Sequence, residues 1–67
     1  MIIRITNNTT LDFEQLCPYL SRTALEDRQR GDGRPAKRNM KTAIGVIEIV
    51  SVSVEDHYII NVSEVSE

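Results

Sequence analysis

The sequence predicts a small α+β domain built in the order strand, helix, strand, strand (β-α-β-β). A β-branched run occupies residues 2–6, and apolar residues at helical spacing follow from Phe13 onward. The last third of the chain, 43–65, alternates as two strands with apolar residues on both faces. Burial of both faces normally belongs to a sheet that is covered on both sides. We therefore expect a short N-terminal strand and a long antiparallel β-hairpin with more apolar surface than one short helical segment covers.

A helix is expected after a turn at residues 7–10, whose two threonines are suitable helix caps. Pro18 falls inside the helical pattern and lacks a backbone donor, so the sequence allows either one kinked helix or two short helices. A capping-box pattern at Thr23 and Glu26 is a start signal for a second helix. The apolar stripe expected to face the core consists of Phe13, Leu16, Cys17, Leu20 and Ala24.

The segment between helix and hairpin, 31–39, predicts a mobile basic loop. It contains two glycines and a proline but no apolar residue larger than Ala36, so it has nothing with which to anchor itself to a core. The hairpin turn is expected near residues 55–56, and the acidic tail from Ser63 is expected to fray. Residues 1–67 are expected to form a single domain, since no linker divides them.

Self-association is the predicted means of stabilisation. A chain of this size buries only about 60% of the surface that its unfolded form exposes. Cys17 is the single cysteine and His57 the single histidine, so neither an internal disulfide nor a Cys/His zinc site is expected, and we expect no cofactor. A homo-oligomer, a dimer or larger, would cover the apolar hairpin; the alternative is a monomer with Val52 and Val54 partly exposed. The predicted interface residues are Ile44, Val46, Ile47, Ile49, Val52 and Ile59.

Charge is distributed unevenly along the chain. Residues 22–41 contain seven of the eight Lys and Arg residues and carry +4, whereas the remainder carries −6. Guanidinium groups bind phosphate oxygens well, so this segment is a candidate site for an anion or a charged partner. It contains no aromatic residue for base stacking, and the alternative is a solvated loop that keeps the protein soluble. The candidate residues are Arg28, Arg30, Arg34, Lys37, Arg38 and Lys41.

Catalysis is not expected. Cys17 and His57 are residue types that form nucleophile and base pairs, but Cys17 lies on the apolar helical stripe, where a buried and inert thiol is the expectation. The chain has neither a basic start followed by an apolar run nor a stretch long enough to span a membrane, so a cytoplasmic protein without membrane contact is expected.

Two functions follow from these patterns. The first is a non-enzymatic regulatory or inhibitory protein that binds another protein through its apolar β-hairpin surface and also self-associates. The second is a binder of nucleic acid or of a phosphorylated ligand through the basic segment 28–41.

Overall fold

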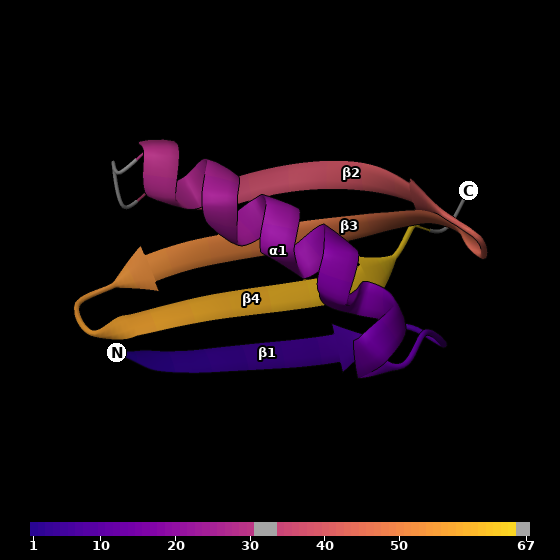
Figure 1. Ribbon diagram of the computed structural model, residues 1–67, viewed down its shortest axis with the longest axis horizontal. Coiled ribbons are helices and arrows are strands. Elements are labelled where there is room, and N and C mark those ends of the chain that lie inside the picture. Colours follow the sequence, from indigo (N-terminus) through magenta and orange to yellow (C-terminus); the bar gives the residue numbers. More distant parts are fainter. Residues whose placement is uncertain (31–33, 66–67) are drawn as a thin grey trace.

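One helix packs across one face of a four-stranded mixed sheet in the computed structural model, which describes residues 1–30 and 34–65 (Figure 1). The strands are ordered β1-β4-β3-β2 in the sheet. The predicted α+β class and the order of strand, helix and C-terminal hairpin are confirmed. The elements are β1 (Ile2–Asn8), α1 (Phe13–Arg30), β2 (Ala36–Thr42), β3 (Gly45–Val54) and β4 (His57–Glu64).

The first and last strands lie side by side. β1 pairs with β4 in parallel, with Ile3 opposite Tyr58, whereas β2–β3 and β3–β4 are antiparallel. The helix crosses the sheet diagonally, from the C-terminal end of β1 to the start of β2 (Figure 1). β1 and β2 are therefore the two edge strands, and none of the described residues forms a helix on the face opposite α1.

The strand β2 was not expected. Residues 36–39 belong to it, so the prediction of a mobile basic loop over 31–39 is wrong for this part, and residues 31–33 lie outside the described part of the chain. The sequence pattern did not reveal this strand because β2 is a charged edge strand. The residues that it turns toward the helix are Ala36, Arg38, Met40 and Thr42. The long strand expected from residue 43 begins instead at Gly45, after a two-residue turn in which Thr42 Oγ1 donates to the Gly45 carbonyl at 2.7 Å.

The C-terminal tail is ordered as far as the structure describes it. Glu64 ends β4, and its carboxylate accepts hydrogen bonds from the backbone N–H and the hydroxyl of Thr10, at 2.9 and 3.0 Å. The N–H of Val65 donates to the carbonyl of Val46 at 3.1 Å. The prediction that the tail frays from Ser63 is therefore wrong for residues 63–65. The bonds described here tie the end of β4 to the β1–α1 connection and to β3.

The helix is one continuous element with Pro18 inside it, which decides between the two alternatives. Its N-cap is Asp12 rather than a threonine: Asp12 Oδ1 accepts from the N–H of Gln15 at 2.8 Å, and Gln15 Oε1 accepts from the N–H of Asp12 at 3.0 Å. Thr23 does not start a second helix; it is fully buried and donates to the carbonyl of Tyr19 at 2.9 Å. Within the described residues, no helix is apolar and long enough to cross a membrane.

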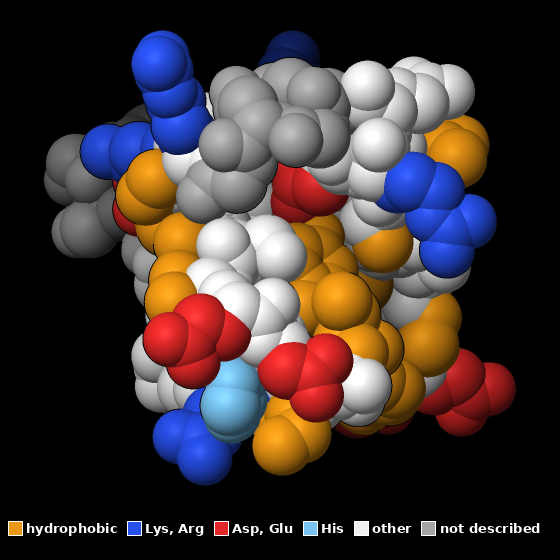
Figure 2. All heavy atoms as spheres, turned by 90° about the vertical axis from the view of Figure 1, so that its left-hand side faces the viewer, with side chains coloured by type: hydrophobic (Ala, Val, Ile, Leu, Met, Phe, Trp, Pro, Cys, Tyr) orange, Lys and Arg blue, Asp and Glu red, His pale blue; other side chains and the backbone are white. Residues whose placement is uncertain are grey.

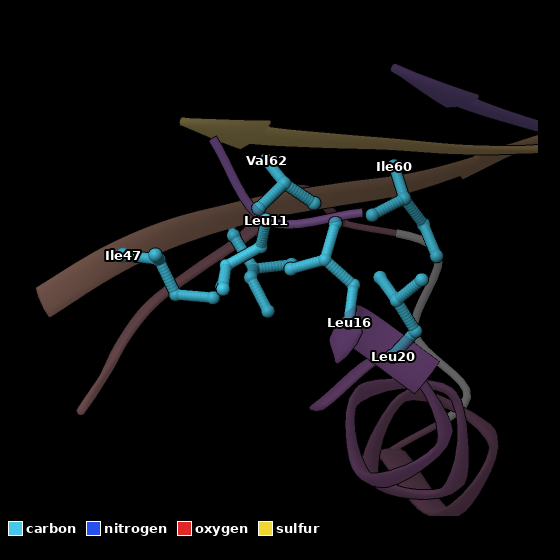
Figure 3. Packing of buried hydrophobic residues seen from close by; sticks show 7 residues of the cluster. Leu11, Leu16, Leu20, Ile47, Ile60 and Val62 are labelled. Atoms are coloured by element: carbon cyan, nitrogen blue, oxygen red, sulfur yellow. The ribbon is translucent and has the colours of Figure 1, made fainter. Parts of the chain in front are cut away.

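The core lies between α1 and the two central strands (Figure 3). Leu16 and Leu20 point from the helix into the side chains of β3 and β4, and Leu11 closes the end near the helix start. The buried hydrophobic cluster comprises Leu11, Leu16, Leu20, Ile47, Ile49, Ile60 and Val62. Three of the five residues of the predicted helical stripe lie outside this core, because Phe13, Cys17 and Ala24 are exposed.

Candidate functional site

The predicted interface residues divide between the two faces of the sheet. Ile47 and Ile49 are fully buried beneath α1, so in the single chain they belong to the core and are not available to a partner. Val46, Val52 and Ile59 alternate with them and lie on the opposite face, which we call the open face. Ile44 lies in the β2–β3 turn and is exposed.

The open face has an apolar centre. Of the five β3 residues that point to it, four are valines and one is Glu48, whereas solvent-facing strand positions are normally polar. The register places Val52 beside Ile59, and it places His57 between Val54 and Ile2. The apolar residues of the open face are Ile2, Val46, Val50, Val52, Val54 and Ile59.

Cations surround this apolar centre. Arg4 lies opposite Ile59, and Lys37 and Lys41 lie opposite Val50 and Val46. Glu48 is the one acidic strand residue on this face, and it forms an ion pair with Lys37 at 3.3 Å. The described strand residues thus give the open face an excess of positive charge, although the whole chain carries −2.

The six predicted anion-binding residues do not form one patch. Lys37 and Lys41 lie on the open face, whereas Arg38 points to the helix side and is mostly buried. Arg28 lines a groove beside α1, described below. Arg34 is exposed and already takes part in an interaction, and Arg30 ends the helix.

Asp27 is the centre of a polar cluster that joins the helix to the sheet. Its Oδ2 accepts hydrogen bonds from Tyr58 OH and, at 2.6 Å, from Ser51 Oγ, and its Oδ1 accepts from Arg38 Nη2 at 3.0 Å. Arg38 also donates to the carbonyl of Thr23 at 3.3 Å and lies 3.5 Å from the Glu26 carboxylate. Each polar side chain of this cluster thereby has a partner, and no described buried side-chain polar atom lacks one.

The surroundings of Asp27 and Tyr58 move their pKa values in opposite directions. Burial disfavours the charged form of Asp27, but the hydrogen bonds from Ser51, Tyr58 and Arg38 and the charge of Arg38 outweigh it, so its pKa lies below the usual 3.8. Burial, together with the hydrogen bond to Asp27 and its negative charge, raises the pKa of Tyr58 to about 12. The pair is therefore a carboxylate that accepts from a neutral phenol across the physiological range of pH.

These shifts predict a loss of stability at both ends of the pH scale. The lowered pKa of Asp27 stabilises the fold above its unfolded value, and this contribution is lost as the pH falls below about 4 and through the folded pKa. The raised pKa of Tyr58 stabilises the fold below pH 10, and this contribution is lost as the pH rises toward 12. Urea unfolding across pH should show both losses; Asp27→Asn should flatten the acid side and Tyr58→Phe the alkaline side. Unchanged pH profiles in both variants would contradict the cluster.

A groove of about 500 Å³ lies between α1 and the N-terminal half of β1, next to this cluster. It opens at the end of the molecule where hydrophobic side chains gather in Figure 2. Cys17 lines the groove and is exposed, contrary to the expectation of a buried thiol. Its lining includes Met1, Ile3, Phe13, Arg28 and Tyr58.

Ser51, Cys17 and His57 are residue types that act as nucleophiles or bases in enzymes. Ser51 is only 1% exposed and its hydroxyl is committed to Asp27, so it does not reach a substrate. Cys17 lines the groove on the helix side, whereas His57 points to the open face, so the sheet separates the two residues considered for catalysis. Residues 1–30 and 34–65 contain no group of three or more side chains arranged to hold a metal ion.

Comparison of the chain with protein-family models, curated proteins and solved structures gave no match. Sequence reasoning missed the Asp27 cluster, although one signal was present: Ser51 continues the inward-facing positions of Ile47 and Ile49, and a polar residue there needs a partner from the helix.

Proposed function

We propose that the protein is a small non-enzymatic interaction protein that regulates or inhibits another protein by binding it through the open face of the sheet. The observation that carries the proposal is the outward row of valines on β3, flanked by Ile59 and Ile2. A contiguous apolar area rimmed by polar residues is typical of a protein interaction site.

Charge favours an acidic partner for this face. Arg4, Lys37 and Lys41 surround the valines and outnumber Glu48, so an apolar partner surface with acidic residues at its rim is complementary to it. A second copy of the chain is a poor occupant of the same face, because face-to-face packing would bring like charges together. Opposite charges at the rim also speed the encounter at low salt.

Binding of nucleic acid or a phosphorylated ligand through residues 28–41 has less support. Phosphate binding requires several cations on one surface, but Arg38 is held by Asp27 and Glu26, and Lys37 is paired with Glu48. Lys41 points to the open face, whereas Arg28 lines the groove on the helix side. Cytoplasmic location remains a prediction from the sequence.

Val52→Asp is the substitution that tests the proposed function. An added carboxylate at the centre of the open face is expected to weaken binding of the partner at least about tenfold, because the charge must be desolvated in an apolar contact. The partner would be obtained by cross-linking the tagged protein in cells of its source, identified by mass spectrometry, purified, and titrated by calorimetry against wild type and variants.

Leu25→Asp is the matched control, because Leu25 is an exposed apolar residue of α1 on the other side of the molecule. It should leave the affinity unchanged, and raising the salt concentration should weaken binding of both the wild type and this variant. Equal affinities for all three proteins would refute the open face as the binding surface. Equal weakening by both substitutions would refute it too, since the effect would then not depend on the face.

A further inference from the structure

The free edge of β1 carries an inference that uses a different surface and does not depend on the proposed function. We propose that two copies of the chain pair through β1 in antiparallel orientation, with Ile5 of one copy opposite Ile5 of the other, to give a continuous eight-stranded sheet. The two helices then lie on the same side of this sheet, and both open faces stay accessible.

The two edges of the sheet differ in their protection. Unpaired edge strands invite pairing with another chain, and lysine or arginine on the edge discourages it. β2 carries Lys37, Arg38 and Lys41, whereas Arg4 is the single charged residue of β1. Ile3, near the start of β1, is 60% exposed, and Phe13, at the start of α1, is 56% exposed. β1 is therefore the edge that is open to pairing.

The backbone of β1 presents alternate residues to its free edge. Ile2 donates its N–H to the carbonyl of Asp56, on the side of β4, at 2.7 Å. In a strand the N–H and C=O groups of successive residues point to opposite sides, so Ile3, Ile5 and Asn7 turn theirs toward the free edge. These three residues form a symmetric set around Ile5, as a two-fold axis through antiparallel strands requires.

Charge selects this register over its neighbour. A two-fold axis at Ile5 places Ile3 opposite Asn7 of the second copy and Arg4 opposite Thr6. An axis at Arg4 would place two arginines directly opposite each other, which is unfavourable. The register around Ile5 therefore avoids a like-charge pair on the cross-strand positions.

The shape of the groove also fits a second copy. Because α1 crosses the sheet diagonally, it leaves the N-terminal half of β1 uncovered, and the groove opens there (Figures 1 and 2). Antiparallel pairing brings the C-terminal end of the second β1, and with it the start of the second helix, to the level of Ile3. The exposed Phe13 of each copy thereby reaches the mouth of the other copy's groove.

Charge complementarity supports the same arrangement. Arg28 lines the groove at the level of Ile3, since the adjacent Asp27 binds Tyr58, the β4 partner of Ile3. Arg28 and Glu14 both lack an ion-pair partner among the described residues. Glu14 lies in the first turn of α1, directly after Phe13. In the paired dimer, Glu14 of each copy approaches Arg28 of the other.

Molar mass and amide exchange test the pairing. Light scattering at increasing concentration should give twice the chain mass of 7.6 kDa, and NMR hydrogen exchange should show protection of the Ile3, Ile5 and Asn7 amides. Ile3→Lys should give a monomer in which these amides exchange freely, because the new cation lies in the seam near Arg28. Ile2→Lys is the matched control and should stay dimeric, since residue 2 points to the open face. A monomeric wild type, or unprotected odd-numbered amides in a dimer, would overturn the proposal.

A charge swap provides a test that does not rely on one variant folding well. Arg28→Glu should weaken the dimer by about tenfold or more, because it then faces Glu14. The double variant Glu14→Arg with Arg28→Glu should restore most of the lost affinity. Failure of the double variant to recover affinity, measured by sedimentation equilibrium, would refute this geometry.

Discussion

Replacing Leu16 with alanine is expected to lower the free energy of unfolding by about 3 kcal/mol, within the 2–5 kcal/mol typical of buried leucines. Leu16 is fully buried and points from α1 into the centre of the core (Figure 3). A domain of this length has about 3–10 kcal/mol of stability in total. The variant should therefore be close to unfolding, because the cluster between α1 and the sheet is the core that Leu16 supports, and its loss takes a large share of the total stability.

Urea unfolding followed by circular dichroism measures this effect, provided that concentration is held constant across variants. Leu25→Ala is the control, since it makes the same change on the same helix at a side chain that is 57% exposed. It should change stability by no more than about 0.5 kcal/mol. Similar losses in both variants would mean that Leu16 does not occupy the core as described.

Replacing Asp27 with alanine is expected to cost about 3 kcal/mol, because it leaves buried donors without an acceptor. The side chain of Asp27 is 14% exposed and that of Arg38 is 18% exposed, so solvent restores little of what is lost. Ser51 and Tyr58 lose the same acceptor. The double variant Asp27→Ala with Arg38→Met should be less destabilised than the sum of its single variants.

Glu26→Ala is the matched control for Asp27→Ala. Glu26 precedes Asp27 and also pairs with Arg38, but its side chain is 49% exposed, so its removal should cost no more than about 0.5 kcal/mol. Both losses can be read from urea unfolding at neutral pH. A cost for Asp27→Ala as small as that for Glu26→Ala would show that the cluster contributes little to stability.

The alternation of apolar residues made the two faces of the C-terminal hairpin predictable. On the first strand of this hairpin, alternation separates Ile47 and Ile49 from the valines at 50, 52 and 54, and the register agrees. Their burial was harder to predict, because alternation shows which side chains share a face but not which face the helix covers.

The pairing of distant strands and the polar contacts between helix and sheet could not be predicted from the sequence. The parallel pairing of β1 with β4 depends on strands from opposite ends of the chain, and β2 lacks the apolar alternation that would reveal it. In the sequence, Asp27 and Arg38 belong to runs of charged residues. No pattern near either residue indicates that the helix places Asp27 against Arg38. Phe13 fits the helical spacing of core residues, but it lines the groove beside β1, where α1 does not cover the sheet, and is exposed.

The pairing of β1 with β4 has a consequence for the order of folding. Ile2 must meet His57, so closing the sheet fixes a loop that includes nearly the whole domain. Contacts between distant residues slow folding, so β1 is expected to join a sheet already formed by the two hairpins of β2, β3 and β4. Until it does, the β4 edge with Ile60 and Val62 is bare. During this interval a second chain competes with β1 for the same edge, and exchange of β1 between chains is the expected form of misfolding.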